Sequence, residues 1–209
     1  MSSEVIEKSF CTTRETATLL GVSVGTVQLW VESGLLRAWK TAGGHRRVMR
    51  DSVERLLRKV ADQPAAPSLI ERQSNPSRKL SVLIVEDDPN LLRLYDAQLS
   101  NWSIPCESVG VDNAFAALLM MGRGGPDLLI TDLHMPEMDG FGMLRVLHKA
   151  PELTNTTIVV VTGLDSAAIA ARGGLPPGIE VLSKPIPFDR LLQIATEIAV
   201  KNNLLLKTA

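Results

Sequence analysis

The chain has 209 residues, of which 45% are hydrophobic and 22% charged, and its formal net charge at pH 7 is −1. This ordinary globular composition excludes a collagen-like or wholly disordered chain, and the length allows one or two domains. No apolar run approaches the ~18 residues of a membrane-spanning helix, no secretory signal is visible, and two cysteines give neither a disulfide framework nor a metal-ligand spacing. We therefore expect a cytoplasmic protein with no membrane contact.

Charge is distributed unevenly along the chain. Residues 1–62 carry ten Lys and Arg against seven Asp and Glu, whereas residues 80–209 carry nine against fifteen. Residues 35–50 contain five basic side chains and no acidic one. A basic head joined to an acidic body predicts a polyanion partner at one end and different chemistry at the other.

The first predicted elements are two short helices joined by a turn. The segment 12–15, Thr-Thr-Arg-Glu, has the form of a capping box that begins a helix running to about Leu20. Ser23 is the expected N-cap of a second helix, from about Val24 to Glu32, and Gly34 is expected to end it in a left-handed conformation. The helical spacing of three valines predicts that they face inward: Val24, Val27 and Val31.

A hairpin and a third helix are expected next. Gly43 and Gly44 lie between two short segments and predict the hairpin turn. Asp51 is expected to cap the third helix. Trp30 and Trp39 are interpreted as packing residues of the core or the hairpin, because single-stranded nucleic acid binding would need more exposed aromatic side chains than this chain has. The proline-rich stretch 61–79 that follows reads as a linker.

The remainder of the chain alternates strand and helix five times, which is typical of a doubly wound α/β domain with a parallel sheet. The expected strands are Ser81–Val85, Pro105–Val109, Leu128–Thr131, Thr157–Val161 and Glu180–Leu182. The expected helices are about 89–100, 112–121, 140–149, 165–172 and 188–200. Asp88, followed by Pro89, is interpreted as the N-cap of the first of these helices.

Polar side chains follow four of these strands. They are Glu86, Asp87, Asp132, Thr162 and Lys184. Strand ends of one parallel sheet lie close together, and several carboxylates in one crevice repel each other unless a cation is present. A few hard oxygen ligands suit Mg²⁺, and carboxylates, Mg²⁺, a lysine and a hydroxyl together are suited to handling a phosphoryl group. Asp132 is the expected nucleophile.

These motifs carry a family resemblance. LIVEDDP, PDLLITDLHMPEMDG, VVVTG and VLSKP occur in an order and spacing that resemble the receiver domain of two-component response regulators, over about residues 79–201. The resemblance implies that Asp132 is the phosphoacceptor, Thr162 the switch hydroxyl and Lys184 the phosphate-binding lysine. It also implies a Mg²⁺ site made of Asp87, Glu86, Asp132 and the backbone carbonyl of His134. The family often has an aromatic residue three positions before the lysine, where this chain has Val181.

The basic end resembles the winged helix-turn-helix of the MerR and excisionase families over about residues 9–60. Ala17 and Gly21 have the small-residue spacing of the helix crossing, and GGHRR matches the wing. By this resemblance the second helix enters the major groove and the wing contacts phosphate or the minor groove. The expected DNA-contacting residues are Arg14, Ser23, Gly25, Thr26, Gln28, Lys40, His45, Arg46 and Arg47.

The sequence therefore predicts a winged helix-turn-helix DNA-binding domain at 1–62, a linker at 63–78 and a flavodoxin-like receiver at 79–209. We expect a transcription factor and not an enzyme. A sensor histidine kinase or phosphotransfer protein is expected to phosphorylate it. It is expected to bind double-stranded DNA and to form a homodimer through the receiver. One alternative is a phosphorelay or adaptor protein whose basic head binds protein or RNA. A flavodoxin-like nucleotide enzyme is another, although no Gly-rich or Ser/Thr-rich phosphate loop follows the first strand of the sheet.

Overall fold

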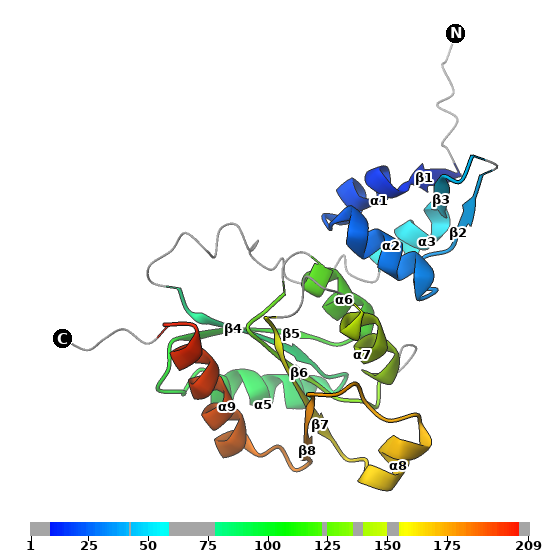
Figure 1. The fold of residues 1–209 in the computed structure, drawn as a ribbon. Coiled ribbons are helices and arrows are strands. Elements are labelled where there is room, and N and C mark those ends of the chain that lie inside the picture. Colours follow the sequence, from blue (N-terminus) through cyan, green and yellow to red (C-terminus); the bar gives the residue numbers. More distant parts are fainter. Residues whose placement is uncertain are drawn as a thin grey trace. The chain divides into compact units, whose positions relative to one another are not determined.

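The structure, a computed structural model, describes residues 9–41, 43–58, 78–122, 125–135, 140–149 and 155–204. The chain divides into two compact units, Met1–Asp62 and Gln63–Ala209, called here the head and the body. Figure 1 shows the elements of both units. The expected linker at 63–78 lies, apart from Arg78, outside the described residues.

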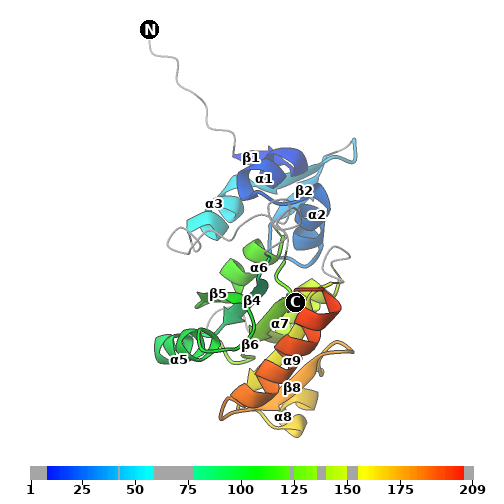
Figure 2. The ribbon, with the colours of Figure 1, turned by 90° about the vertical axis from the view of Figure 1, so that its left-hand side faces the viewer.

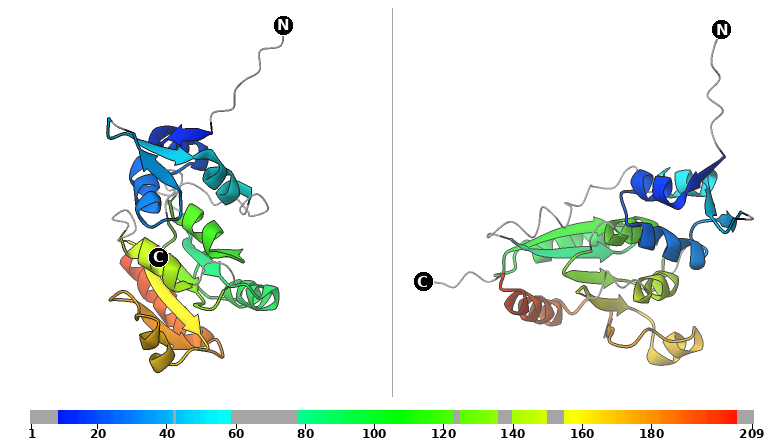
Figure 3. Two further views of the ribbon diagram at one scale, coloured as in Figure 1. Left: turned by 90° about the vertical axis from the view of Figure 1, so that its right-hand side faces the viewer. Right: turned by 45° about the horizontal axis from the view of Figure 1, so that its top comes forward.

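The head contains three helices and a small antiparallel sheet. The helices are α1 (Thr13–Leu20), α2 (Val24–Glu32) and α3 (Arg50–Arg58). The strands are β1 (Phe10–Thr12), β2 (Ala38–Lys40) and β3 (Arg46–Met49), in the order β1-β3-β2. Strands β2 and β3 form the expected hairpin, whose tip projects beyond the helices of the head (Figure 3). Strand β1 is absent from the sequence-based prediction.

The predicted starts of α1 and α2 are confirmed. Thr12 and Glu15 form both bonds of the capping box, with the Glu15 amide donating to the Thr12 hydroxyl at 3.1 Å and the Glu15 carboxylate accepting from the Thr12 amide at 2.7 Å. The Ser23 side chain accepts from the Thr26 amide at 2.9 Å. Gly21 ends α1 with φ of +67°, where a side chain would be strained.

Two expectations about the head are wrong. Val24 is 38% exposed, because α2 turns Val27 and Trp30 into the core instead. Asp51 is not the N-cap of α3, which begins one residue earlier at Arg50. The Asp51 carboxylate instead accepts from Arg37 at 2.5 Å and from Arg55 at 3.1 Å, so it ties the hairpin segment to α3.

The body contains a five-stranded parallel sheet. Its strands are β4 (Leu80–Val85), β5 (Cys106–Val111), β6 (Leu128–Thr131), β7 (Thr157–Thr162) and β8 (Glu180–Ser183). The strand order β5-β4-β6-β7-β8 places β4, β6 and β7 in the middle of the sheet. These three strands carry the apolar runs that a sheet covered on both faces requires. The expected fold class is confirmed.

Helices cover both faces of this sheet, as Figures 1 and 2 show. One face packs against α5 (Pro89–Leu99) and α9 (Phe188–Lys201), which contribute Tyr95, Leu99, Leu191 and Ile194 to the core. The other is covered by α6 (Ala114–Gly122), α7 (Gly140–His148) and α8 (Ser166–Ala171). Helix α8 has six residues and none of them is buried. None of the described helices is long and apolar enough to cross a membrane.

Candidate functional site

Four strand ends meet at the carboxyl edge of the sheet. The register pairs Val85 of β4 with Thr131 of β6, and Thr162 of β7 with Ser183 of β8. Glu86, Asp132 and Lys184 each follow directly after a strand, while Thr162 ends its strand. Further backbone bonds hold the edge together, since the Asp132 amide donates to the Val85 carbonyl at 3.0 Å and the Lys184 amide to the Thr162 carbonyl at 2.8 Å.

Lys184 joins the two buried carboxylates of this edge. Its ammonium nitrogen lies 2.7 Å from Asp132 Oδ2 and 2.8 Å from Glu86 Oε2. Glu86 is 2% exposed and Asp132 is 7% exposed. Removing two carboxylates from water is costly unless each is paired, so the lysine supplies the charge that permits this burial. The sequence-based prediction that these three side chains meet at one edge is therefore matched by the geometry.

The backbone after β6 supports the second oxygen of Asp132. Oδ1 accepts from the Leu133 amide at 2.5 Å and from the His134 amide at 3.1 Å. Together with Lys184 these bonds fix both oxygens of the carboxylate, and the side chain has one defined orientation. The side chain of His134 itself is exposed.

Gly140 is a residue of this site that the sequence analysis missed. A Cβ at Gly140 would lie 2.4 Å from the carbonyl oxygen of Asp132 and 2.8 Å from Leu133 Cα, both backbone atoms. The Gly140 amide donates to the Leu133 carbonyl at 3.1 Å, so the start of α7 packs directly on the loop that carries Asp132. A glycine immediately after the MPEMD segment was the only available signal, and a sequence alone does not reveal such a close approach.

Burial and neighbouring charges set the titration of this edge. Burial raises the pKa of Glu86 above its usual range, although the bond to Lys184 opposes that rise. Burial would lower the pKa of Lys184, but its bonds to Asp132 and Glu86 raise it instead. Burial also raises the pKa of the Tyr95 phenol, and the negative charges of Glu86 and Asp132 add to this effect. Lys184 is therefore charged at neutral pH.

The remaining expected residues, Asp87 and Thr162, differ in their exposure. Asp87 is exposed, and Asp88 caps α5 by accepting from the Asn90 amide at 2.8 Å, as predicted. Thr162 is fully buried and its hydroxyl accepts from the Leu164 amide at 3.3 Å. Among the described residues, no three His, Cys, Asp or Glu side chains are gathered closely enough to enclose a metal. Magnesium needs only one or two carboxylates beside its waters, so the two carboxylates that Lys184 joins, Glu86 and Asp132, are of the kind this ion takes.

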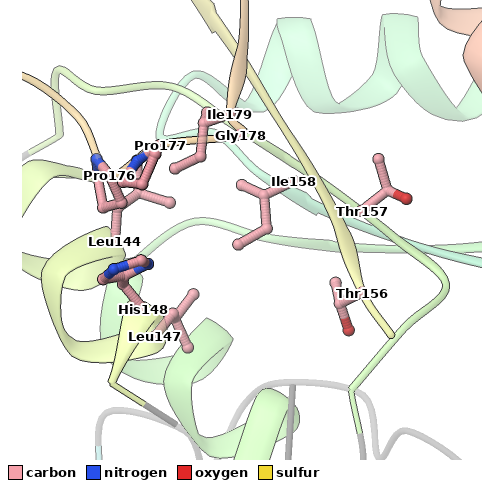
Figure 4. A pocket seen from close by; sticks show the side chains of 10 residues that line it. All are labelled: Leu144, Leu147, His148, Thr156, Thr157, Ile158, Pro176, Pro177, Gly178 and Ile179. Carbon is pink, nitrogen blue, oxygen red and sulfur yellow. The ribbon is translucent and has the colours of Figure 1, made fainter. Parts of the chain in front are cut away.

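A hollow of about 450 Å³ lies elsewhere on the body (Figure 4). Its walls are the end of α7, the start of β7 and the loop before β8, contributed by Leu144, Leu147, His148, Thr156, Thr157, Ile158 and the run from Pro176 to Ile179. None of the expected site residues lines it. The carboxyl edge of the sheet with Glu86, Asp132 and Lys184, called here the acidic edge, is thus a separate site.

The expected DNA-contacting residues lie on the head in different environments. Arg14, Ser23, Gly25, Gln28, Lys40 and His45 are exposed. Thr26 differs from them, because it is 3% exposed and its hydroxyl lies 2.8 Å from that of Ser23 in the cap of α2. Arg46 is paired with Glu32 at 2.7 Å, and the Arg47 guanidinium lies 5.9 Å from the centroid of the Phe10 ring.

Comparison with known proteins assigns each unit to a described domain type. The model of the response regulator receiver domain matches residues 82–196, and that of a helix-turn-helix domain matches residues 10–61. Both matches agree with the resemblances read from the sequence. The receiver match contains every residue of the acidic edge.

Relatives and solved structures resemble the body. The chain is 28% identical over 122 residues to the two-component response regulator ARR2 of Arabidopsis thaliana, covering 58% of this chain and 18% of that protein. It is 32% identical over 108 residues to the response regulator PleD of Caulobacter vibrioides, covering 50% and 23%. The chain thus spans about a fifth of the length of these curated relatives. A crystal structure of a sensor protein from Polaromonas sp. JS666 is similar with a TM-score of 0.51 and 26% identity, covering 60% of this chain and 98% of that one.

Proposed function

Because the chain belongs to the response regulator receiver family and also carries a helix-turn-helix domain, we propose that it is a transcription factor controlled by phosphorylation of Asp132. The observation that carries the proposal is the pairing of one lysine with two buried carboxylates at a sheet edge. In this proposal residues 1–62 bind DNA and residues 79–209 receive the phosphoryl group. Residues 63–78 form the linker between these two domains. The protein is a regulator and not an enzyme.

The proposed reaction is phosphoryl transfer to a carboxylate. An oxygen of Asp132 attacks the phosphorus of a phosphohistidine in a sensor kinase or phosphotransfer protein, a P–O bond forms, and the P–N bond to the donor imidazole breaks. The two backbone amides on Oδ1 keep the carboxylate oriented, which leaves Oδ2, now held by Lys184, as the attacking atom. The product is an acyl phosphate.

Lys184 and Thr162 are proposed to hold the product. When Asp132 becomes an acyl phosphate, its Oδ2 loses its negative charge, and the ammonium of Lys184 pairs with a phosphoryl oxygen instead. Thr162 is the last residue of the neighbouring strand β7, and its hydroxyl is proposed to donate a hydrogen bond to the phosphoryl group at the same edge. Mg²⁺, held by Glu86, Asp87, Asp132 and the His134 carbonyl, would neutralise the phosphoryl oxygens when bound.

The head is proposed to bind double-stranded DNA. Helix α2 presents exposed Gly25 and Gln28 near its start, where such helices reach base edges, and the hairpin carries Lys40, His45 and Arg47. A single module buries a limited DNA surface, so we propose that the receiver forms a homodimer that brings two heads to two half-sites.

Labelling of the whole chain tests the phosphorylation site. With a small phosphodonor and Mg²⁺, the wild type should gain one phosphoryl group, and Asp132→Asn should gain none because its amide is not a nucleophile. Asp189→Asn, which changes an exposed carboxylate of α9, should label like the wild type. Normal labelling of Asp132→Asn would refute the assignment.

Selection of duplexes from a random-sequence pool tests the DNA-binding part. The full chain, with and without phosphodonor, should recover a common sequence, and its affinity should change with phosphorylation. Recovery of no duplex sequence, or equal affinity in both states, would contradict the transcription-factor proposal.

A further inference from the structure

An ion pair joins the end of α2 to the start of the hairpin strand β3. The Arg46 guanidinium lies 2.7 Å from Glu32 Oε1, and the Arg46 side chain is 25% exposed. Glu32 is the last residue of α2 and Arg46 the first of β3. Because side chains four residues apart share a helix face, Glu32 continues the exposed row formed by Val24 and Gln28. The pair thus connects the outer face of α2 to the hairpin.

The basic residues of the hairpin region divide into two classes. Arg37, Arg46 and Arg50 pair with acids of the head, namely Asp51 at 2.5 Å, Glu32 at 2.7 Å and Glu54 at 3.1 Å. Lys40, the neighbour of Arg46 across the hairpin, has no ion pair within the described parts of the chain. Arg47 has none there either, and its guanidinium lies over the Phe10 ring.

We propose that Glu32 is a positioning residue for DNA recognition: its bond to Arg46 fixes the hairpin against α2 and keeps Arg46 out of the phosphate contacts. Those contacts fall to Lys40 and Arg47. The inference rests on the proposed DNA-binding function of the head.

Counterion release supplies the physical reason. Each cation that neutralises a phosphate contributes about 0.9 to the slope of log affinity against log salt concentration. An arginine already neutralised by a carboxylate contributes little. The ion pair between Glu32 and Arg46 instead fixes the distance between α2 and the hairpin. This distance determines which base edges α2 reaches when the hairpin contacts the DNA backbone, so the ion pair affects specificity.

Four variants of the full chain separate these roles. The probes are a duplex selected with the wild type and a scrambled duplex of equal length, each titrated over a range of salt. Arg47→Gln should flatten the slope by about 0.9, whereas Arg46→Gln should leave it unchanged. Glu32→Gln should steepen it by up to about 0.9, because Arg46 is released. The charge-swapped variant E32R/R46E restores the pair and should recover the wild-type slope.

Specificity is the second readout. Glu32→Gln and Arg46→Gln should each lower the ratio of specific to scrambled affinity by a factor of about 1.4 to 5, the range expected for a surface ion pair, and E32R/R46E should recover it. Asp51→Asn is the control: it also removes one acid from the head and releases Arg37 and Arg55, but it does not alter α2. Its specificity ratio should remain that of the wild type.

The outcomes are separable. Flattening of the slope by about 0.9 in Arg46→Gln would show that Arg46 contacts phosphate, and it would overturn the inference. An unchanged specificity ratio in Glu32→Gln, or an equal loss in Asp51→Asn, would overturn it as well. Failure of the wild type itself to bind any duplex would instead defeat the proposed function, and the inference with it.

Discussion

Replacing Lys184 with methionine should destabilise the body strongly, because it leaves two buried carboxylates without a cation. Removing one partner of a buried ion pair costs about 3–5 kcal/mol. The Lys184 side chain is 24% exposed, and solvent screens part of the charge, so we expect a loss of about 2–3 kcal/mol in the free energy of unfolding. Millimolar Mg²⁺ should recover part of this loss, since it supplies the missing positive charge between Glu86 and Asp132.

Hydrogen exchange in increasing urea would measure this effect in the body alone. Peptides covering β4 and β6 report the two strands that carry Glu86 and Asp132, whereas a whole-molecule signal would mix both units. Lys149→Met removes an exposed lysine of the same unit and serves as the control. Equal stability of Lys184→Met and Lys149→Met, or no response of Lys184→Met to Mg²⁺, would refute the reasoning.

Three further substitutions test local features. Gly140→Ala should destabilise the body by about 1–3 kcal/mol and lower its Tm, because the new Cβ meets backbone atoms of Asp132 and Leu133. Gly163→Ala places its Cβ in open space and should leave the Tm unchanged. An equal Tm for the two variants would argue against this packing. Thr12→Ala should destabilise α1 by about 1 kcal/mol, because it removes the N-cap side chain. The amides of α1 should then exchange faster in Thr12→Ala than in the control Thr18→Ala. Equal exchange rates in the two variants would count against the cap. The slight desolvation of Asp51 would raise its pKa, but Arg37 and Arg55 lower it below the usual 3.8. A carboxyl group with a lowered pKa stabilises the folded state at pH values above its usual pKa, and this stabilisation is lost as the pH falls through the lowered value. Below pH 3.8 the stability of the head should therefore fall more steeply with pH in the wild type than in Asp51→Asn. Parallel curves of stability against pH would exclude this contribution.

The body was predictable from the sequence because its signals are local. Apolar runs in β4, β6 and β7 determine the sheet, and the polar residues at the ends of β4, β6, β7 and β8 determine the edge that carries Glu86, Asp132, Thr162 and Lys184. The errors lie where distant partners decide. The second strand was expected at Pro105–Val109, but pairing of Leu80 with Cys106 and Val85 with Val111 moves it to Cys106–Val111. The next helix then begins at Ala114, where the Asn113 side chain accepts from the Ala116 amide at 2.8 Å.

The head shows the limit of reading charges from sequence. Residues 35–50 look uniformly basic because their acidic partners lie outside that stretch: Glu32 precedes it, and Asp51 and Glu54 follow it. Only the fold brings Arg46 back to the end of α2, fourteen residues earlier in the chain. Strand β1 escaped prediction for the same reason, since three residues show no periodicity and its pairing partner β3 is far along the chain. A count of basic residues therefore overstates the cations available to DNA, and the side chains to test first are those without an acidic partner in the described structure, Lys40 and Arg47.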